Sequence, residues 1–293
     1  MEENMETKLS LLVHQKPMLK VLGQVFSNAL LGSIKKKGEP FPFGQTMSMT
    51  VDAVANDVVD SFIKWLNVKN RYENEIPAHF FPQWSIPLAF ELGKNHPYPL
   101  HKVINQGCSL KILKPVPRGQ QFHLEGIFVE AKKEENKSRL HQRVITKDLQ
   151  GNTLLEADFH SVFISGKGIK KKKEQFKLPD NAQLVGQWSV VANDGKNYGI
   201  ISGDLNPIHW SSAAAKISGF PNKILHGFAS FSKTFECLLD YGLNPKEIDV
   251  RFLSPVVLPA QVKVYIVALE GRYELLVTNQ NETKLHLKGE FKV

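Results

Sequence analysis

The alternation of apolar and polar residues predicts two helices, each followed by a set of strands. Apolar side chains in residues 226–242 recur every three or four positions, as on the buried face of a helix, and Gly242 is expected to end it. Residues 82–93 give a shorter apolar helix. Four runs of alternating or β-branched residues follow each helix, at 103–113, 119–131, 138–148 and 153–165 in the first half and at 247–253, 260–270, 272–279 and 283–292 in the second.

This repeated order of helix and strands predicts an internal duplication. The segment Leu113-Lys-Pro-Val has a counterpart in Leu253-Ser-Pro-Val, 140 residues later. A long apolar helix followed by antiparallel strands indicates a sheet wrapped around a helix, and pairing two copies covers an otherwise exposed sheet edge. We therefore predict an α+β fold with two antiparallel sheets, each wrapped around a central helix.

A lysine-rich segment near the middle predicts the boundary between the two halves. Residues 168–177 read GIKKKKEQFK, with glycine, proline and asparagine nearby. No aromatic residues interleave with the lysines, as a groove for single-stranded nucleic acid would require, so we interpret the segment as a solvated linker. The predicted organisation is an N-terminal domain over residues 1–166, a linker over 167–182 and a C-terminal domain over 183–293.

The N-terminal region adds an amphipathic helix to this organisation. Apolar residues recur near helical spacing within residues 19–38, but polar residues interrupt them too often for a membrane span. We expect this helix to dock on the protein rather than to lie on a membrane. The first residues are acidic, which argues against a secretion signal.

Charge and cysteine content narrow the partners and the compartment. The formal net charge is +8 and the pI about 9.3, which favours anionic partners such as nucleic acid or a phosphorylated or acidic substrate carrier. Cys108 and Cys237 are the only cysteines, too few for a disulfide framework or a cysteine metal cluster. A reducing compartment, and with it a cytoplasmic location, is the expectation.

The segment SGDLNPIH, residues 202–209, carries the clearest candidate chemistry. Pro207 fixes its own backbone and pushes Asn206 away from helix, so the chain turns between Asp204 and His209. Residues 211–219 then read as a short helix that a serine begins and a glycine ends. A stiff loop with helix on either side can hold a carboxylate and an imidazole in one geometry. The plainer interpretation is a helix-capping acid and a structural histidine.

The wider segment resembles the hydratase-2 motif of the MaoC-like dehydratases, which are related to (R)-specific enoyl-CoA hydratases. The motif positions present here are Tyr198, Ser202, Gly203, Asp204, Asn206, Pro207, Ile208, His209, Ala215, Gly219, Phe220, Ile224, His226 and Gly227. The resemblance implies a double hot-dog fold and reversible syn addition of water to a trans-2-enoyl thioester. It implies that Asp204 and His209 act on the water and that the Gly227 amide binds the thioester oxygen.

Further residues are weighed for substrate contact. Ser202, Asn206, His226 and Ser232 are candidate substrate-binding residues, although a structural role is an alternative for each. At the offset of 140 residues, Gly227 falls on Pro87, which has no N–H to offer an oxyanion, so we predict that the N-terminal half lacks a catalytic site. Residues 79–90 of that half are expected either to line an acyl tunnel or to form core.

The expected partner is an acyl thioester of coenzyme A or acyl carrier protein, with no cofactor, no metal, no nucleic acid and no integral membrane association. The alternatives are a hot-dog acyl-thioesterase, a non-catalytic acyl-thioester or nucleic-acid binding protein and, least favoured, a metal hydrolase that uses Asp204, His209 and His226. Because two copies in one chain pair internally, either a monomer or a homodimer is compatible with the sequence.

Overall fold

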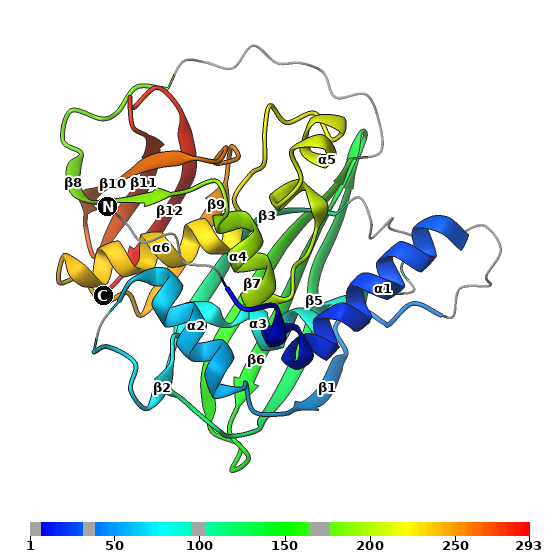
Figure 1. The fold of residues 1–293 in the computed structure, drawn as a ribbon. Coiled ribbons are helices and arrows are strands. Elements are labelled where there is room, and N and C mark those ends of the chain that lie inside the picture. The colour runs from blue at the N-terminus through cyan, green and yellow to red at the C-terminus, as the bar shows by residue number, and fades with distance from the viewer. Residues whose placement is uncertain (1–6, 32–38, 69, 95, 97–102, 165–175) are drawn as a thin grey trace.

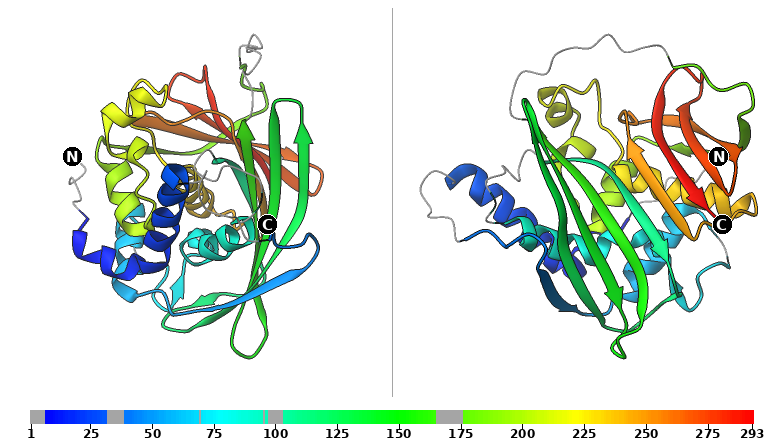
Figure 2. Two further views of the ribbon diagram at one scale, coloured as in Figure 1. Left: turned by 90° about the vertical axis from the view of Figure 1, so that its right-hand side faces the viewer. Right: turned by 180° about the vertical axis from the view of Figure 1, so that it is seen from behind.

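The computed structural model describes residues 7–31, 39–68, 70–94, 96, 103–164 and 176–293. A long antiparallel sheet curves around the helices, all of which lie on one side of it (Figures 1 and 2). Its strands are β1 (Thr46–Val51), β3 (Val103–Ile112), β5 (Phe122–Glu134), β6 (Lys137–Lys147), β7 (Thr153–Ile164), β8 (Gln183–Val190), β9 (Glu247–Phe252), β10 (Ala260–Leu269), β11 (Arg272–Asn279) and β12 (Leu285–Lys292). A separate two-stranded sheet pairs β2 (Glu75–Ile76) with β4 (Val116–Pro117).

The two halves of the chain contribute the same strand order to this sheet. Read from the outer edge to the centre, the order is β1-β5-β6-β7-β3 in the first half and β8-β10-β11-β12-β9 in the second. Strands β3 and β9 pair antiparallel at the centre, with Ser109 opposite Asp249. The two predicted sheets are joined in one continuous ten-stranded sheet, because the edges of the two copies, which were expected to pair, hydrogen-bond to each other.

Two helices occupy the concave side of the sheet, one from each half. The predicted helix over residues 82–93 is α3 (Pro82–Gly93), and the one predicted within 226–242 is α6 (Gly227–Asp240). The other helical segments are η1 (Leu9–Gln15), α1 (Lys16–Leu31), α2 (Asn56–Leu66), η2 (Ala78–Phe80), α4 (Asp194–Ser202), η4 (Pro207–His209) and α5 (Ser212–Ile217).

One hydrophobic core runs through both halves. Phe62, Phe80 and Phe81 of the first half and Phe231 of the second are completely shielded from solvent and belong to the same cluster of packed residues. Most of the apolar residues in 79–90 are buried here, as the core interpretation of that segment predicted. Because the core is shared, the segment of the second half that carries the candidate site residues packs against side chains of the first half.

The N-terminal helix docks on the body of the protein. It begins earlier than predicted, at Lys16, and packs against α3 (Figure 1), while residues 32–38 of the predicted span lie outside the described residues. Most of the predicted lysine-rich linker, residues 167–175, also lies outside the described residues. Within the described part of the chain, no helix has both the length and the apolar character needed to cross a membrane.

The first residues of α3 and α6 correct the offset of 140 residues that was predicted for the duplication. The offset of 140 residues fits the strand ends, since Leu113 follows β3 and Leu253 follows β9. It does not fit the helices, because α3 begins at Pro82 and α6 at Gly227, and Pro87 lies inside α3. Pro82 is therefore the counterpart of Gly227, and it too has no backbone N–H.

Candidate active site

The predicted loop connects two helices through a sharp backbone turn. Helix α4 ends at Ser202, and Gly203 adopts a left-handed conformation with φ of 76°, which is the common way for a helix to stop. Asn206 then caps η4 by accepting a hydrogen bond from the Ile208 amide at 3.3 Å. His209 is the last residue of η4, and Ser211, one of the two serines expected as the cap, caps α5. The turn thus carries Asp204 and His209 on a backbone fixed at both ends.

His209 has a defined orientation and tautomer. Its Nδ1 lies 2.8 Å from the backbone carbonyl of Ile224, and since a carbonyl only accepts, Nδ1 carries the hydrogen. The other ring nitrogen, Nε2, therefore has a free lone pair. Burial lowers the pKa of the His209 imidazole, an effect that the nearby Asp204 charge partly opposes. His209 is accordingly held as a neutral base.

His226 contacts both His209 and the backbone of Asp204. Its ring stacks on His209, with centroids 3.5 Å apart, and its Nε2 donates to the backbone carbonyl of Asp204 at 3.0 Å. Burial, followed by the neighbouring His209, lowers the pKa of His226 to about 3. A neutral, buried imidazole that holds the Asp204 backbone fits a role in fixing the loop and the start of α6, the structural alternative considered for this residue.

The side chains of Asp204 and His209 lie at a distance suited to sharing one water molecule. A carboxylate oxygen of Asp204 and one ring nitrogen each of His209 and His226 all lie within 4.8 Å of one another. A water that donates two hydrogen bonds of about 2.8 Å at a tetrahedral angle joins acceptors about 4.6 Å apart. The Asp204 side chain is 38% exposed, so this carboxylate is open to small molecules.

The Gly227 amide stands at the first position of α6. Such an amide is one of the helix donors without an intrahelical partner, and the helix dipole adds partial positive charge there. A Cβ at Gly227 would lie 2.6 Å from the Phe252 ring, so glycine allows this ring to close over the helix start. The amide follows His226 directly in the chain and is therefore adjacent to the Asp204–His209 pair.

The remaining candidate residues have different surroundings. Ser202 is buried, and its hydroxyl accepts a hydrogen bond from the Asp204 amide at 3.3 Å. Asn206 is exposed and caps η4. Ser232 is completely buried, and its hydroxyl donates to the carbonyl of His79 at 3.4 Å, across the contact between the two halves. The structure does not bring Ser232 together with the loop, and substrate contact by these three residues stays a prediction.

The donor set at the loop fits a metal poorly. Three ligand atoms are close enough together, but His226 Nε2 carries a hydrogen directed at the Asp204 carbonyl and has no lone pair to offer there. A second group, His141, Asp158 and His160, has similar spacing on β6 and β7. There Arg143 already binds both carboxylate oxygens of Asp158, at 2.7 and 2.9 Å.

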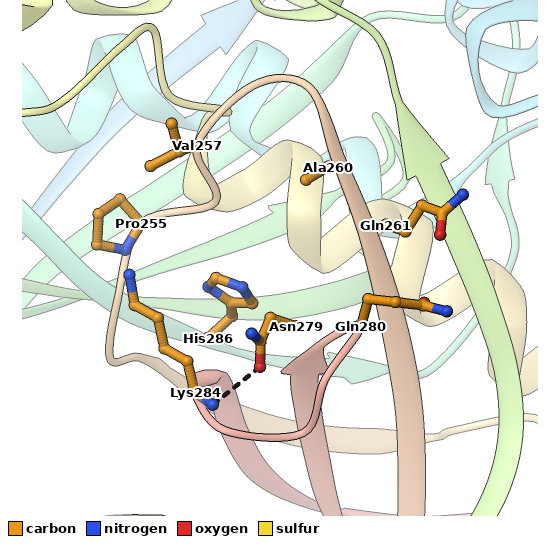
Figure 3. A pocket seen from close by; sticks show the side chains of 8 residues that line it. All are labelled: Pro255, Val257, Ala260, Gln261, Asn279, Gln280, Lys284 and His286. Carbon is orange, nitrogen blue, oxygen red and sulfur yellow. Dashed lines mark hydrogen bonds between the residues drawn. The ribbon is translucent and has the colours of Figure 1, made fainter.

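A pocket of about 250 Å³ lies elsewhere in the C-terminal half (Figure 3). Its lining residues are Pro255, Val257, Ala260, Gln261, Asn279, Gln280, Lys284 and His286, none of which was predicted for the site. The Asn279 side chain accepts hydrogen bonds from the amides of Thr283 and Lys284, so it is engaged in the turn between β11 and β12. The predicted site residues are therefore absent from the lining of this pocket.

Replacing Gly203 with Ala is expected to damage the loop. The left-handed backbone alone costs an alanine about 1–2 kcal/mol, and the new Cβ would lie 2.7 Å from Met18 Cβ and 2.9 Å from Gln15 Oε1. We expect a lower Tm and a lower kcat. Gly219→Ala is the matched control, because Gly219 has φ of 86° but nothing within 4 Å. If both variants behave alike, the contact with Met18 and Gln15 is unimportant.

Comparison with known protein families finds a match to the part of the chain that carries this loop. A family profile described as "MaoC like domain" matches residues 173–286, which include the whole loop and α6. Residues 173–286 are thus similar to a MaoC-like domain. The resemblance expected from the sequence is thereby confirmed, and the match begins within the predicted linker.

Relatives of this chain carry the names of enzymes. The 3-hydroxyacyl-thioester dehydratase X of Mycobacterium tuberculosis is 26% identical over 230 residues, covering 74% of this chain and 79% of that protein. The peroxisomal enoyl-CoA hydratase 2 of Arabidopsis thaliana is 32% identical over 93 residues, 29% of this chain and 30% of its own length.

Solved structures agree on the fold. The crystal structure of HtdX of Mycobacterium tuberculosis superposes with a TM-score of 0.68 at 17% identity, over 84% of this chain and 99% of that one. Another Mycobacterium tuberculosis protein, described as having a double hotdog fold, superposes with a TM-score of 0.55 at 10% identity, over 86% and 96% of the two chains. The chain therefore has the hot-dog architecture, here with its two halves joined in one sheet.

Proposed function

We propose that the protein is a hydro-lyase that reversibly adds water to a trans-2-enoyl thioester and forms an (R)-3-hydroxyacyl thioester. The carrying observation is that a carboxylate and a neutral imidazole converge within 4.8 Å on a stiff loop beside a helix N-terminus. The names of the dehydratase and hydratase relatives support the same reaction class.

The two side chains have complementary roles toward one water. Asp204 is an acceptor when ionised, and His209 offers the Nε2 lone pair, because its Nδ1–H is held by Ile224. Water is a weak nucleophile, so one of the two groups must take a proton while the water oxygen bonds to C3 of the enoyl thioester. A proton is then delivered to C2 on the same face. In dehydration the pair removes the C2 proton and protonates the leaving hydroxyl.

The Gly227 amide supplies the electrostatic half of the mechanism. As water attacks C3, negative charge develops on the thioester oxygen. A helix N-terminal N–H that is already oriented stabilises this charge without further reorganisation. Glycine leaves the amide accessible, since it has no Cβ beside the Phe252 ring. The N-terminal half has Pro82 at the equivalent place, so we infer one catalytic site per chain.

The assay that tests this function uses trans-2-enoyl thioesters of several chain lengths, on both coenzyme A and acyl carrier protein. Loss of the conjugated absorbance is followed in parallel with thiol release. Hydration without thiol release is expected. Thiol release would instead identify an acyl-thioesterase, and silence in both channels with a folded protein would leave only a binding function.

The pH dependence of hydration follows from the environment of His209. Its pKa is lowered by burial, so the neutral base persists below the ordinary histidine pKa of 6.5. We expect kcat/KM for hydration to stay constant as pH falls to about 6.5 and to decline only as pH passes through the lowered pKa. The measurement is kcat/KM between pH 4.5 and 8. An acid limb with its midpoint above 6.5 would contradict this environment.

The remaining expectations concern carrier, location and assembly. A formal net charge of +8 suits either coenzyme A or an acidic carrier protein. We propose a cytoplasmic protein that acts as a monomer or a homodimer, without a cofactor.

A further inference from the structure

Two side chains hydrogen-bond to backbone carbonyls on either side of the turn at Gly203. His226 Nε2 donates to the Asp204 carbonyl at 3.0 Å, and Gln15 Nε2 donates to the Ile201 carbonyl at 2.6 Å. Ile201 belongs to the last turn of α4, whose carbonyls have no partner within the helix. Gln15 supplies that partner from a segment 186 residues earlier in the chain.

The orientation of the Gln15 amide is fixed. Its side chain is completely buried, at 0% exposure, where η1 meets α1. Its Oε1 accepts a hydrogen bond from Gln83 Nε2 of α3 at 2.7 Å. With the oxygen directed at Gln83, the amide nitrogen is directed at Ile201. Gln15 therefore joins the N-terminal segment, the helix of the N-terminal half and the loop of the C-terminal half.

The same segment also contacts the turn itself. A Cβ at Gly203 would fall 2.7 Å from Met18 Cβ and 2.9 Å from Gln15 Oε1, so these two residues press directly on the backbone next to Asp204. Nearby, the Thr7 amide donates to the Asn197 side chain of α4 at 3.2 Å. The N-terminal segment thus contacts α4 from Asn197 to Ile201, and it also contacts Gly203, the residue before Asp204.

We propose that Gln15 is a positioning residue that holds the Asp204 carboxylate in line with His209. This inference rests on the proposed function. Gln15 acts through the backbone of Ile201 and Gly203 and does not touch the reacting atoms. A carboxylate that must meet a shared water cannot shift by much without losing rate, since small misplacements of a catalytic group cost 10²-fold or so.

The principal variant is Gln15→Met, which keeps the length of the side chain and removes both hydrogen bonds. We expect kcat for hydration, normalised to folded protein, to fall about tenfold or more while KM changes less than about twofold. His14→Ala is the matched control: it alters the adjacent residue, which pairs with Asp57 at 3.1 Å and not with the loop. Its kcat is expected to remain that of the wild type.

A second readout separates positioning from simple loss of folded protein. The titratable groups next to His209 are Asp204 and His226, and the Asp204 charge raises the pKa of His209. If Gln15→Met lets the carboxylate move away, the pKa of His209 falls further and the acid limb of kcat/KM moves to lower pH. A reduced folded fraction lowers the plateau but leaves the limb in place.

Three outcomes decide the inference. A Gln15→Met variant with wild-type kcat and an unmoved acid limb overturns it. If Gln15→Met does not fold, Gln83→Met replaces it, because the Gln83 side chain orients the Gln15 amide by donating to its Oε1. An unchanged kcat in that variant also overturns the inference. If the wild-type protein hydrates nothing, the proposed function fails, and NMR titration of His209 in wild type and Gln15→Met still tests the positioning.

Discussion

Asp204→Asn is expected to lower kcat for hydration by about 10³-fold, because the amide cannot accept a proton from water. The substitution keeps the size of the side chain, and the carboxylate is partly exposed, so the fold should persist. His209→Ala is expected to have a comparable effect, since it removes the Nε2 lone pair that we propose binds the water. The measurement is the initial rate with a trans-2-enoyl thioester, with Tm and circular dichroism recorded for each variant.

Asp249→Asn provides the control for the loss of one carboxylate. Asp249 lies on β9 between the buried residues Ile248 and Val250, so its half-exposed side chain projects from the opposite, outer face of the sheet. This variant should retain the wild-type rate. Near-wild-type turnover in Asp204→Asn or His209→Ala would remove that residue from its proposed role.

Removing the Gly227 N–H is expected to give the second largest decrease in kcat. Proline at this position mimics Pro82 of the other half and is well tolerated at the start of a helix. The preceding residue, His226, already has φ of −61° and ψ of 144°, as a residue before proline requires. Losing one oxyanion donor should lower kcat by about 10²–10³-fold, or about 3 kcal/mol of barrier.

The comparison must allow for the Phe252 ring, which leaves no room for a Cβ at Gly227. We therefore place the substitution in a Phe252→Ala background and compare Gly227→Pro with Gly227→Ala there. Both variants carry a Cβ, and only proline lacks the N–H. Equal kcat values for the two double variants would show that the amide does not stabilise the transition state.

Local patterns were enough for the elements with strong periodicity. Helices α3 and α6 and eight of the ten long strands fall where the apolar spacing predicted them. The edge strands β1 and β8 were not predicted, and neither was α2. Strand β1 alternates only between exposed and half-buried positions, so its apolar signal is weak. The joining of the halves into one sheet depends on the long-range β3–β9 pairing, which no local pattern encodes.

In the candidate site, too, a local sequence motif identifies some residues, and others become visible only in the folded chain. Asp204 and His209 lie five positions apart on one loop, so a short motif identifies both. The groups that orient them come from elsewhere: the Ile224 carbonyl binds His209, and Gln15 binds Ile201. Gln15 stands in an otherwise ordinary amphipathic stretch, and its contact becomes visible only when the chain is folded. Ser232 is a similar case, since its helical spacing from Gly227 gave no indication that its hydroxyl would donate to the His79 carbonyl.

The β3–β9 seam has an evolutionary consequence. In a symmetric pair of identical chains, one gene encodes both members, and any substitution is imposed on both at once. Here each member is encoded separately while the linkage keeps them together at any dilution. Pro82 can therefore stand at the helix start of one copy while Gly227 stands at that of the other, because a substitution in one copy leaves the other unchanged.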